Sequence, residues 1–292
     1  MGKKKKHDSS SMGLKTVIEP NGKNHQYWID IWRYRGLAFN LAKRDITVRY
    51  KQTMIGLGWS IIHPIVNMLI MTFIFGSVAN LSSDGSAPYA VMVYAGIIPW
   101  TLFSKNLTIT SSVFLREALL MKKVYFPRII ASLGDSLAVL VDAAISFLIL
   151  LLIILISYFT NGFVPSWRIV LVPFFFIFPI ALGFFIGMFL SPANIRWRDL
   201  NQAIPFLISL GQYVTPVGYS FAEACRNVPE KYRFVYELNP AAGVINVIRW
   251  CIIPGNEFHW PSFIAALVCI AVFAPLGIKV FRKGERTFVD LV

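Results

Sequence analysis

Charged side chains are scarce in this sequence. Lys, Arg, Asp and Glu make up 15% of the 292 residues, whereas apolar residues make up 56%. Soluble domains carry about 25% charged residues, so most of this surface does not face water. The charge that is present is one-sided, with 28 basic against 15 acidic residues. In an apolar chain such an excess is typical of anchoring against anionic lipid, so we expect membrane lipid as a partner and no nucleic acid.

Cysteine is also rare. Three cysteines provide no disulfide framework, although Cys225 and Cys251 could pair if their segment faces an oxidising compartment. The basic start Met1–Lys6 is followed by polar residues instead of an apolar run. This excludes a secretory signal peptide of the ordinary kind.

Patterns that carry catalysis are missing as well. The four histidines are scattered without metal-ligand spacing, and no Ser lies in a Gly-x-Ser-x-Gly turn. There is no Gly-x4-Gly-Lys-Ser/Thr phosphate loop either. We therefore predict that this chain is not an enzyme and holds no metal or cofactor of its own.

Long apolar runs, by contrast, are abundant. A bilayer core of about 30 Å needs roughly 20 apolar residues per helix. Runs of suitable length cover residues 60–79, 89–112, 129–159, 169–190, 203–222 and 262–280. Several contain prolines, such as Pro216 in the fifth run, which packed membrane helices tolerate. The predicted fold is an all-α integral membrane protein with six transmembrane helices, whose transmembrane domain covers residues 53–285.

Basic residues fall mostly on one side of these spans. With six spans, 22 of the 28 Lys and Arg residues lie before the first span, after the second, after the fourth or after the sixth. Cytoplasmic loops carry such an excess, so both termini are expected in the cytoplasm of a multi-pass protein. Residues 1–27 then form a basic, disordered tail, and residues 286–292 form a cytoplasmic C-terminal tail.

Two segments outside the spans have a helical pattern. Residues 28–52 carry two apolar stripes, which favours an interfacial helix packed partly against protein, with an ordinary linker as the alternative. Asn239-Pro240 is typical of a helix N-cap followed by proline at the first helical position. The run to Ile253 has about 15 residues and covers about 22 Å, so it is predicted to be re-entrant between spans five and six.

Few charged residues lie inside the spans. They are Lys105 in the second span and Asp135 and Asp142 in the third. The two aspartates are seven residues apart and therefore share one helix face. A proton relay is one interpretation, and a polar contact that stabilises the bundle is the one we favour.

Aromatic side chains occur beside amides within the spans. Aromatic residues make up 15% of the chain, and rings flanked by amides suit sugars, whose C–H faces pack on rings while their hydroxyls form hydrogen bonds. Packing within the bundle is the alternative for each of these residues. The candidate substrate-path residues are Trp59, Asn67, Tyr94, Trp100, Asn106, Gln212, Tyr213 and Tyr219.

A series of short motifs resembles one known family. The motifs are Arg44-Asp45-Ile46-Thr47-Val48-Arg49-Tyr50 with Gly56-Leu57-Gly58-Trp59, then Tyr94-Ala95-Gly96-Ile97-Ile98-Pro99-Trp100, Lys122-Lys123-Val124-Tyr125-Phe126-Pro127-Arg128, Trp197-Arg198-Asp199-Leu200, Thr215-Pro216-Val217-Gly218-Tyr219 and Asn239-Pro240-Ala241-Ala242. In this order they are similar to the type-2 ABC transporter permeases that export polysaccharides. The resemblance covers about residues 28–285. The family commonly has an asparagine where this chain has Arg116-Glu117.

The resemblance implies a homodimeric permease that joins two separate ABC ATPase subunits, which bind the ATP and Mg. The expected cargo is a lipid-linked glycan, either O-antigen or capsular polysaccharide, that crosses the inner membrane of a bacterium. A teichoic acid exporter of the same family is an alternative. Alternatives from other classes are an ion-coupled secondary transporter that uses Asp135 and Asp142, and a membrane-embedded glycosyl- or acyltransferase.

The resemblance suggests a role for one cytoplasmic loop, and the aromatic residues and the short capped segment suggest two further roles. The loop 113–128 is expected to dock into the ATPase through Glu117, Lys122 and Lys123. The conduit is expected at the dimer interface, lined by the first, second and fifth spans. Asn239, Pro240 and Gly243 belong to the segment expected to close its outer end, with Gly243 and Gly255 as points where that segment could pivot.

Overall fold

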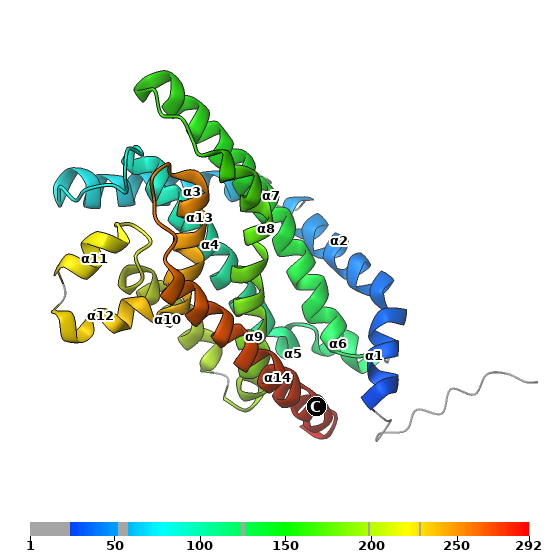
Figure 1. The fold of residues 1–292 in the computed structure, drawn as a ribbon. Coiled ribbons are helices and arrows are strands. Elements are labelled where there is room, and N and C mark those ends of the chain that lie inside the picture. Colours follow the sequence, from blue (N-terminus) through cyan, green and yellow to red (C-terminus); the bar gives the residue numbers. More distant parts are fainter. Residues whose placement is uncertain (1–23, 52–57, 124–125, 198, 228, 292) are drawn as a thin grey trace, which may run out of the picture.

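The computed structural model describes residues 24–51, 58–123, 126–197, 199–227 and 229–291. Within these ranges the chain is helical and contains no β-strand, as expected for an all-α protein (Figure 1). In chain order the helices are α1 (Asn24–Arg33), α2 (Arg35–Lys51), α3 (Gly58–Met71), the π-helix η1 (Thr72–Val78), α4 (Tyr89–Ser111), α5 (Val113–Arg116), α6 (Ala118–Lys123), α7 (Ile129–Asn161), the 3-10 helix η2 (Trp167–Leu171), α8 (Val172–Phe175), α9 (Ile177–Arg196), α10 (Leu200–Val214), α11 (Phe221–Asn227), α12 (Glu230–Glu237), α13 (Pro240–Ile252) and α14 (Trp260–Leu291).

Four helical segments of the described chain are long and apolar enough to cross a membrane. They are Gly58–Val78, Ile129–Asn161, Trp167–Arg196 and Trp260–Glu285. These segments correspond to the first, third, fourth and sixth predicted spans. α7 has 33 residues, and it projects beyond its neighbours at one end of the molecule (Figure 1). The fold is therefore that of a polytopic membrane protein.

The second and fifth predicted spans form helices that are less apolar or shorter than these four segments. α4 has 23 residues and is long enough to cross, but it contains Lys105 and Asn106 and is less apolar than the four segments above. α10 has only 15 residues and ends at Val214, which is short of the predicted end at residue 222. Pro216 explains this early end, because proline lacks an N–H and disfavours a helical backbone in the residue before it.

α4 lies at the centre of the bundle. Its neighbours are α9, α7, α13 and α3. Close packing against α9 depends on glycine, because a Cβ added at Gly183 would overlap the carbonyl oxygen of Phe103. Asn106 strengthens the same contact: its side-chain amide donates a hydrogen bond to the carbonyl oxygen of Ile180 at 2.7 Å and accepts one from the Ser136 hydroxyl at 3.0 Å. Small residues and interhelical hydrogen bonds of this kind hold membrane helices together.

Several parts of the chain that are distant in sequence meet at one end of the bundle. The Tyr27 hydroxyl of α1 donates a hydrogen bond to Glu285 of α14 at 3.2 Å, and the backbone N–H of Arg128, just before α7, donates to the same carboxylate at 3.0 Å. Nearby, Phe114 of α5 stacks on Phe281 of α14 with ring centroids 4.7 Å apart. We call this end, formed by α1, α2, α5, α6, the start of α7 and the end of α14, the basic end. α11, α12 and α13 lie toward the opposite end (Figure 1).

The predicted helix over residues 28–52 is divided in two. α1 ends at Arg33 and α2 begins at Arg35, so the chain bends at Tyr34. α2 runs beside the first part of α7. Gly134 of α7 makes this possible, because a Cβ there would lie 3.0 Å from the carbonyl oxygen of Ala38 and 3.1 Å from Cβ of Leu41. The segment packs against protein on this side, while Trp32 and Phe39 are exposed.

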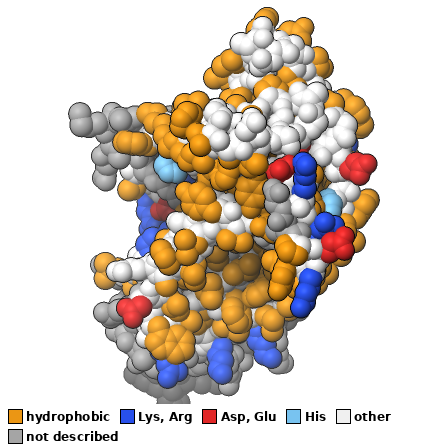
Figure 2. Space-filling model, turned by 90° about the vertical axis from the view of Figure 1, so that its left-hand side faces the viewer, with side chains coloured by type: hydrophobic (Ala, Val, Ile, Leu, Met, Phe, Trp, Pro, Cys, Tyr) orange, Lys and Arg blue, Asp and Glu red, His pale blue; other side chains and the backbone are white. Residues whose placement is uncertain are grey.

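The surface outside the basic end is strongly apolar. Figure 2 shows hydrophobic side chains over much of one side of the molecule, with Lys and Arg side chains along its lower edge. Exposed residues on α3 and α10 include Leu69, Phe206, Leu207 and Leu210. A soluble monomer rarely exposes apolar patches of such extent, so this surface faces lipid or another protein.

Candidate functional site

The eight candidate path residues separate into two groups. The first group lies toward the surface on α3, α10 and the segment that follows α10. Trp59 is 55% exposed and Tyr213 is 60% exposed, while Asn67, Gln212 and Tyr219 are half-buried. Tyr219 is turned back on its own chain, because its hydroxyl donates hydrogen bonds to the carbonyl oxygens of Val214 at 3.0 Å and Tyr213 at 3.2 Å.

The second group, on α4, is buried within a single chain. The Tyr94 side chain is fully buried, with its hydroxyl 3.5 Å from the carbonyl oxygen of Ser146. Trp100 is 7% exposed and packs where Gly211 of α10 leaves room for its ring. Asn106 is fully buried by its contacts with α9 and α7. These three residues pack the bundle, and only the first group reaches the surface of the chain.

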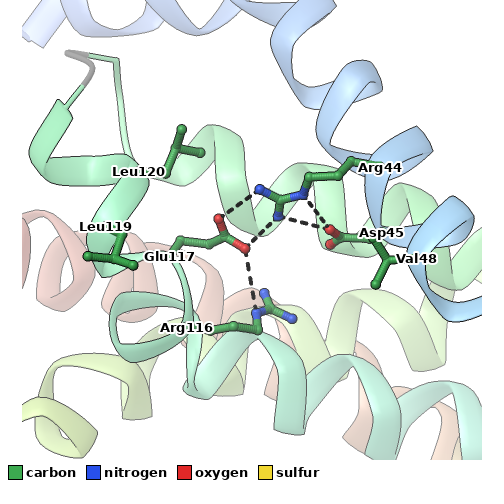
Figure 3. Close-up of a pocket in the computed structure, with 7 residues that line it drawn as sticks. All are labelled: Arg44, Asp45, Val48, Arg116, Glu117, Leu119 and Leu120. Atoms are coloured by element: carbon green, nitrogen blue, oxygen red, sulfur yellow. Dashed lines mark hydrogen bonds and ion pairs between the residues drawn. The ribbon is translucent and has the colours of Figure 1, made fainter. Parts of the chain in front are cut away.

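The predicted coupling loop contains an ionic cluster at the basic end. Glu117 lies between α5 and α6 and is 7% exposed. The Arg44 guanidinium of α2 donates two hydrogen bonds to its carboxylate, at 2.6 and 3.2 Å, and another to Asp45 at 2.9 Å (Figure 3). The hydrogen bond from Arg44 to Glu117 raises the pKa of Arg44 above its usual range. The two-pronged geometry ties the loop to α2.

A second arginine extends the cluster into the bundle. Arg116 lies 3.9 Å from Glu117 and forms an ion pair with Asp135 of α7. These side chains surround a cleft of about 470 Å³, which is also lined by Val48, Leu119 and Leu120. The side chains of Lys122 and Lys123 lie outside the described residues. The loop is therefore fixed to both α2 and α7 by charges that the sequence analysis singles out separately, and the structure brings them together.

The intramembrane carboxylates are both paired. Asp135 meets Arg116, and Asp142 lies 2.5 Å from the Lys105 ammonium of α4. Each carboxylate thus faces a cation from a neighbouring helix. A buried charge with a partner costs much less free energy than one without, so this arrangement favours the structural interpretation of Asp135 and Asp142 over a proton relay.

The predicted outer closure has the expected helix start. The Asn239 side chain accepts hydrogen bonds from the backbone N–H groups of Ala241 at 2.9 Å and Ala242 at 3.4 Å, with Pro240 at the first helical position. α13 has 13 residues, which is too short to cross a bilayer. A Cβ at Gly243 would overlap the carbonyl oxygen of Ser262, so this glycine allows α13 to approach α14. Gly255, which has a φ of +75°, lies in the turn after the helix.

Arg249 of α13 is a site residue that sequence reasoning did not identify. Its side chain is fully buried. The guanidinium donates hydrogen bonds to the carbonyl oxygens of Val217 at 2.8 Å, Tyr219 at 2.9 Å and Met92 at 3.3 Å. Asp84 lies 3.6 Å away. The signal in the sequence is a single arginine within a short apolar run.

The described part of the chain contains neither a metal-binding cluster nor a disulfide. No group of three or more His, Cys, Asp or Glu residues in this part is placed to hold a metal ion. Cys225, Cys251 and Cys269 are free thiols, so the pairing of the first two is not formed.

Comparison with known proteins gives one family and several relatives. Residues 37–253 match the family described as ABC-2 type transporter. An O-antigen export system permease protein RfbA of Klebsiella pneumoniae is 27% identical over 257 residues, which is 86% of this chain and 93% of the relative. A second protein of the same name and species is 28% identical over the same shares. A third, from Myxococcus xanthus, is 25% identical over 190 residues, 65% of this chain and 70% of the relative. The family match runs from α2 to the end of α13.

Proposed function

Because the chain belongs to the ABC-2 type transporter family, we propose that it is the permease subunit of an ATP-driven exporter that moves a lipid-linked polysaccharide across the bacterial cytoplasmic membrane. The observation that carries this proposal is the similarity to O-antigen export permeases over 93% of their length. O-antigen polysaccharide is accordingly the cargo that we propose. The partner ATPase is proposed because the sequence has no phosphate loop.

The proposed membrane arrangement has six spans with both termini in the cytoplasm. α4 and α10 cross the bilayer together with the four long apolar segments, and α13 enters and leaves on the outer side. α10 covers about 22 Å, and the segment 215–219 completes its path. The basic end then faces the cytoplasm, in agreement with the distribution of Lys and Arg along the chain. This places the cluster around Glu117 where a cytoplasmic ATPase has access to it.

The proposed assembly is a homodimer with two ATPase subunits. A conduit for a sugar polymer needs more helices than one chain provides. The face formed by α3 and α10 is apolar and carries Trp59 and Tyr213, together with the amides of Asn67 and Gln212. Against a second copy, these rings and amides would offer a moving polymer many weak, similar contacts. Deep hydrogen-bonded pockets would hold the polymer in place.

The proposed coupling route begins at the loop 113–128. An ATPase that pushes on this loop acts on Glu117 and Arg116, and through them on α2 and α7. Ion pairs with two or more hydrogen bonds hold geometry better than single contacts. The cluster therefore supports transmission of a movement from the ATPase into the membrane domain.

A gene deletion tests the proposed function. Cells that lack this chain should lose the glycan from the surface and accumulate the lipid-linked glycan on the cytoplasmic face of the inner membrane, because synthesis continues without export. Expression of the chain should restore the surface glycan. A deletion strain with unchanged surface glycan, or one whose lipid-linked precursor is no longer made, would exclude the export function.

A further inference from the structure

The end of α10 is held in an unusual way. The helix stops at Val214, and residues 215–218 are buried although their backbone is not helical. Buried carbonyl groups outside a helix need hydrogen-bond donors from elsewhere, above all at membrane depth. In this segment the donors come from two other helices.

Three successive carbonyl oxygens are satisfied by side chains. Arg249 of α13 donates to Val217 at 2.8 Å and to Tyr219 at 2.9 Å, and the Tyr89 hydroxyl of α4 donates to Gly218 between them at 2.8 Å. Arg249 also donates to Met92 of α4 at 3.3 Å. One fully buried guanidinium thus joins the end of α10 to both α13 and α4.

The surroundings are shaped for this guanidinium. A Cβ at Gly96 of α4 would lie 2.9 Å from a terminal nitrogen of Arg249 and 2.5 Å from the carbonyl oxygen of Val217. Asp84 supplies a carboxylate at 3.6 Å. The planar fork of arginine reaches several acceptors at once, which the single ammonium of lysine does not reproduce. The site is therefore specific for arginine and not simply for a positive charge.

The body of α10 contrasts with its fixed end. Ile204 is the only buried residue of the helix, and large apolar side chains such as Phe206 and Leu210 are exposed. Elements with few buried contacts move at low cost in free energy. α10 thus leads directly into a segment that is fastened at Val217, Gly218 and Tyr219, while the helix itself is lightly packed within its own chain.

We propose that Arg249 is a positioning residue for export: it anchors one end of α10 to α4 and α13, and α10 pivots about this anchor when the transport path opens. This inference rests on the proposed function, because it places α10 beside the path. Arg249 acts on the helix and does not touch the cargo.

Substitutions give the first test. Arg249→Lys keeps the charge but loses simultaneous donation to Val217 and Tyr219, so export should fall about tenfold while folded yield and ATP hydrolysis stay within about twofold. Tyr89→Phe removes only one hydroxyl, so it should also reduce export, but by a smaller factor than Arg249→Lys. The matched control is Arg168→Lys, which makes the same substitution at another arginine. The Arg168 guanidinium carbon lies 4.3 Å from the centroid of the Trp250 ring, and export should not change in this variant. Normal export by both Arg249→Lys and Tyr89→Phe would overturn the proposal.

Distances measured in the complex with the ATPase give a second test that does not depend on the cargo. Spin labels are placed at Glu257→Cys and at either Val214→Cys or Asn201→Cys, with the native cysteines changed to alanine and labelled chains diluted with unlabelled ones. On ATP binding, the 214–257 distance should stay constant and the 201–257 distance should change. Arg249→Lys should broaden the 214–257 distribution. The anchor would be refuted if both distances change equally, if neither changes, or if Arg249→Lys leaves the 214–257 distribution unaffected. A parent chain that exports no glycan would refute only the proposed function.

Discussion

At the scale of single residues, the cluster around Glu117 is the most informative feature. Glu117 is 7% exposed and receives two hydrogen bonds from Arg44. Removal of Arg44 leaves Glu117 with an unmatched buried charge. The two side chains should therefore behave as one unit.

A double-mutant cycle measures this coupling. Arg44→Met and Glu117→Gln should each destabilise the purified permease, and the double variant should be less destabilised than the sum of the two by about 1–3 kcal/mol. The exposed pair Arg233 and Glu230, at 3.5 Å, is the matched control and should give a coupling near zero, as surface pairs do. Thermal unfolding in detergent provides the free energies. A coupling near zero for Arg44 and Glu117 would show that the cluster does not hold the loop.

The same residues carry a functional prediction. Alanine at Glu117, Lys122 and Lys123 together should leave membrane insertion intact and uncouple ATP hydrolysis from export, because the docking loop would no longer pass force to α2 and α7. Hydrolysis and surface glycan are measured separately in the same cells. Export at the parent level in this triple variant would rule out the coupling role.

The paired aspartates allow a test of the driving force. Asp135→Asn and Asp142→Asn keep a polar contact to Arg116 and Lys105 but lose the titratable proton. Under the proposed function both variants should fold and retain substantial export, because ATP would drive the exporter instead of a proton gradient. Loss of transport in Asp142→Asn with normal folded yield would favour a proton-coupled carrier, whereas loss in Asp135→Asn alone would point to the coupling route through Arg116.

At the scale of helices, close approach through glycine fixes α4 against α9. Gly183→Ala would place a methyl group against the carbonyl oxygen of Phe103, and overpacking of this kind costs about 1–3 kcal/mol. Gly36→Ala is the control, because no atom lies within 4 Å of the added Cβ, and stability should be unchanged or slightly higher. The unfolding temperatures of the two purified variants are compared with each other and with that of the parent chain. Equal stability would mean that α4 and α9 are not held by this contact.

The two groups of candidate path residues should respond differently to alanine. Trp59→Ala and Tyr213→Ala alter exposed rings, so folded yield and hydrolysis should stay normal while surface glycan falls. Tyr94→Ala and Trp100→Ala empty buried sites and should destabilise the fold by about 3–5 kcal/mol. Yield, ATPase rate and glycan are recorded for each variant. Full export by both exposed variants would exclude a lining role for these two rings.

The sequence predicts helices better than it predicts where their side chains point. α4 (Tyr89–Ser111), α7 (Ile129–Asn161) and the Asn239 cap agree closely with the predicted ranges. The sequence of a helix that is apolar all round does not indicate which of its faces is buried. The burial of Tyr94 and Trp100 is therefore not predicted. α10 ends at Val214, short of the predicted span, because Pro216 also restricts the backbone of the residue before it.

At the scale of the whole molecule, the family resemblance is confirmed by the match over residues 37–253. The role of Arg249 depends on contacts between segments around residues 92, 217 and 249. These contacts form only in the folded chain, and a sequence pattern within one segment does not predict them. The same applies to the ion pair between Arg116 and Asp135.

The central claim is that ATP, hydrolysed by a partner subunit, drives a lipid-linked glycan through this chain. The most direct measurement uses inverted membrane vesicles that contain the permease, its ATPase and labelled lipid-linked glycan. Export from the cytoplasmic face appears there as uptake into the vesicle lumen. The account predicts uptake with ATP, none with a non-hydrolysable analogue, and none with an imposed proton gradient after ATP depletion. Uptake that follows the proton gradient without ATP would contradict it.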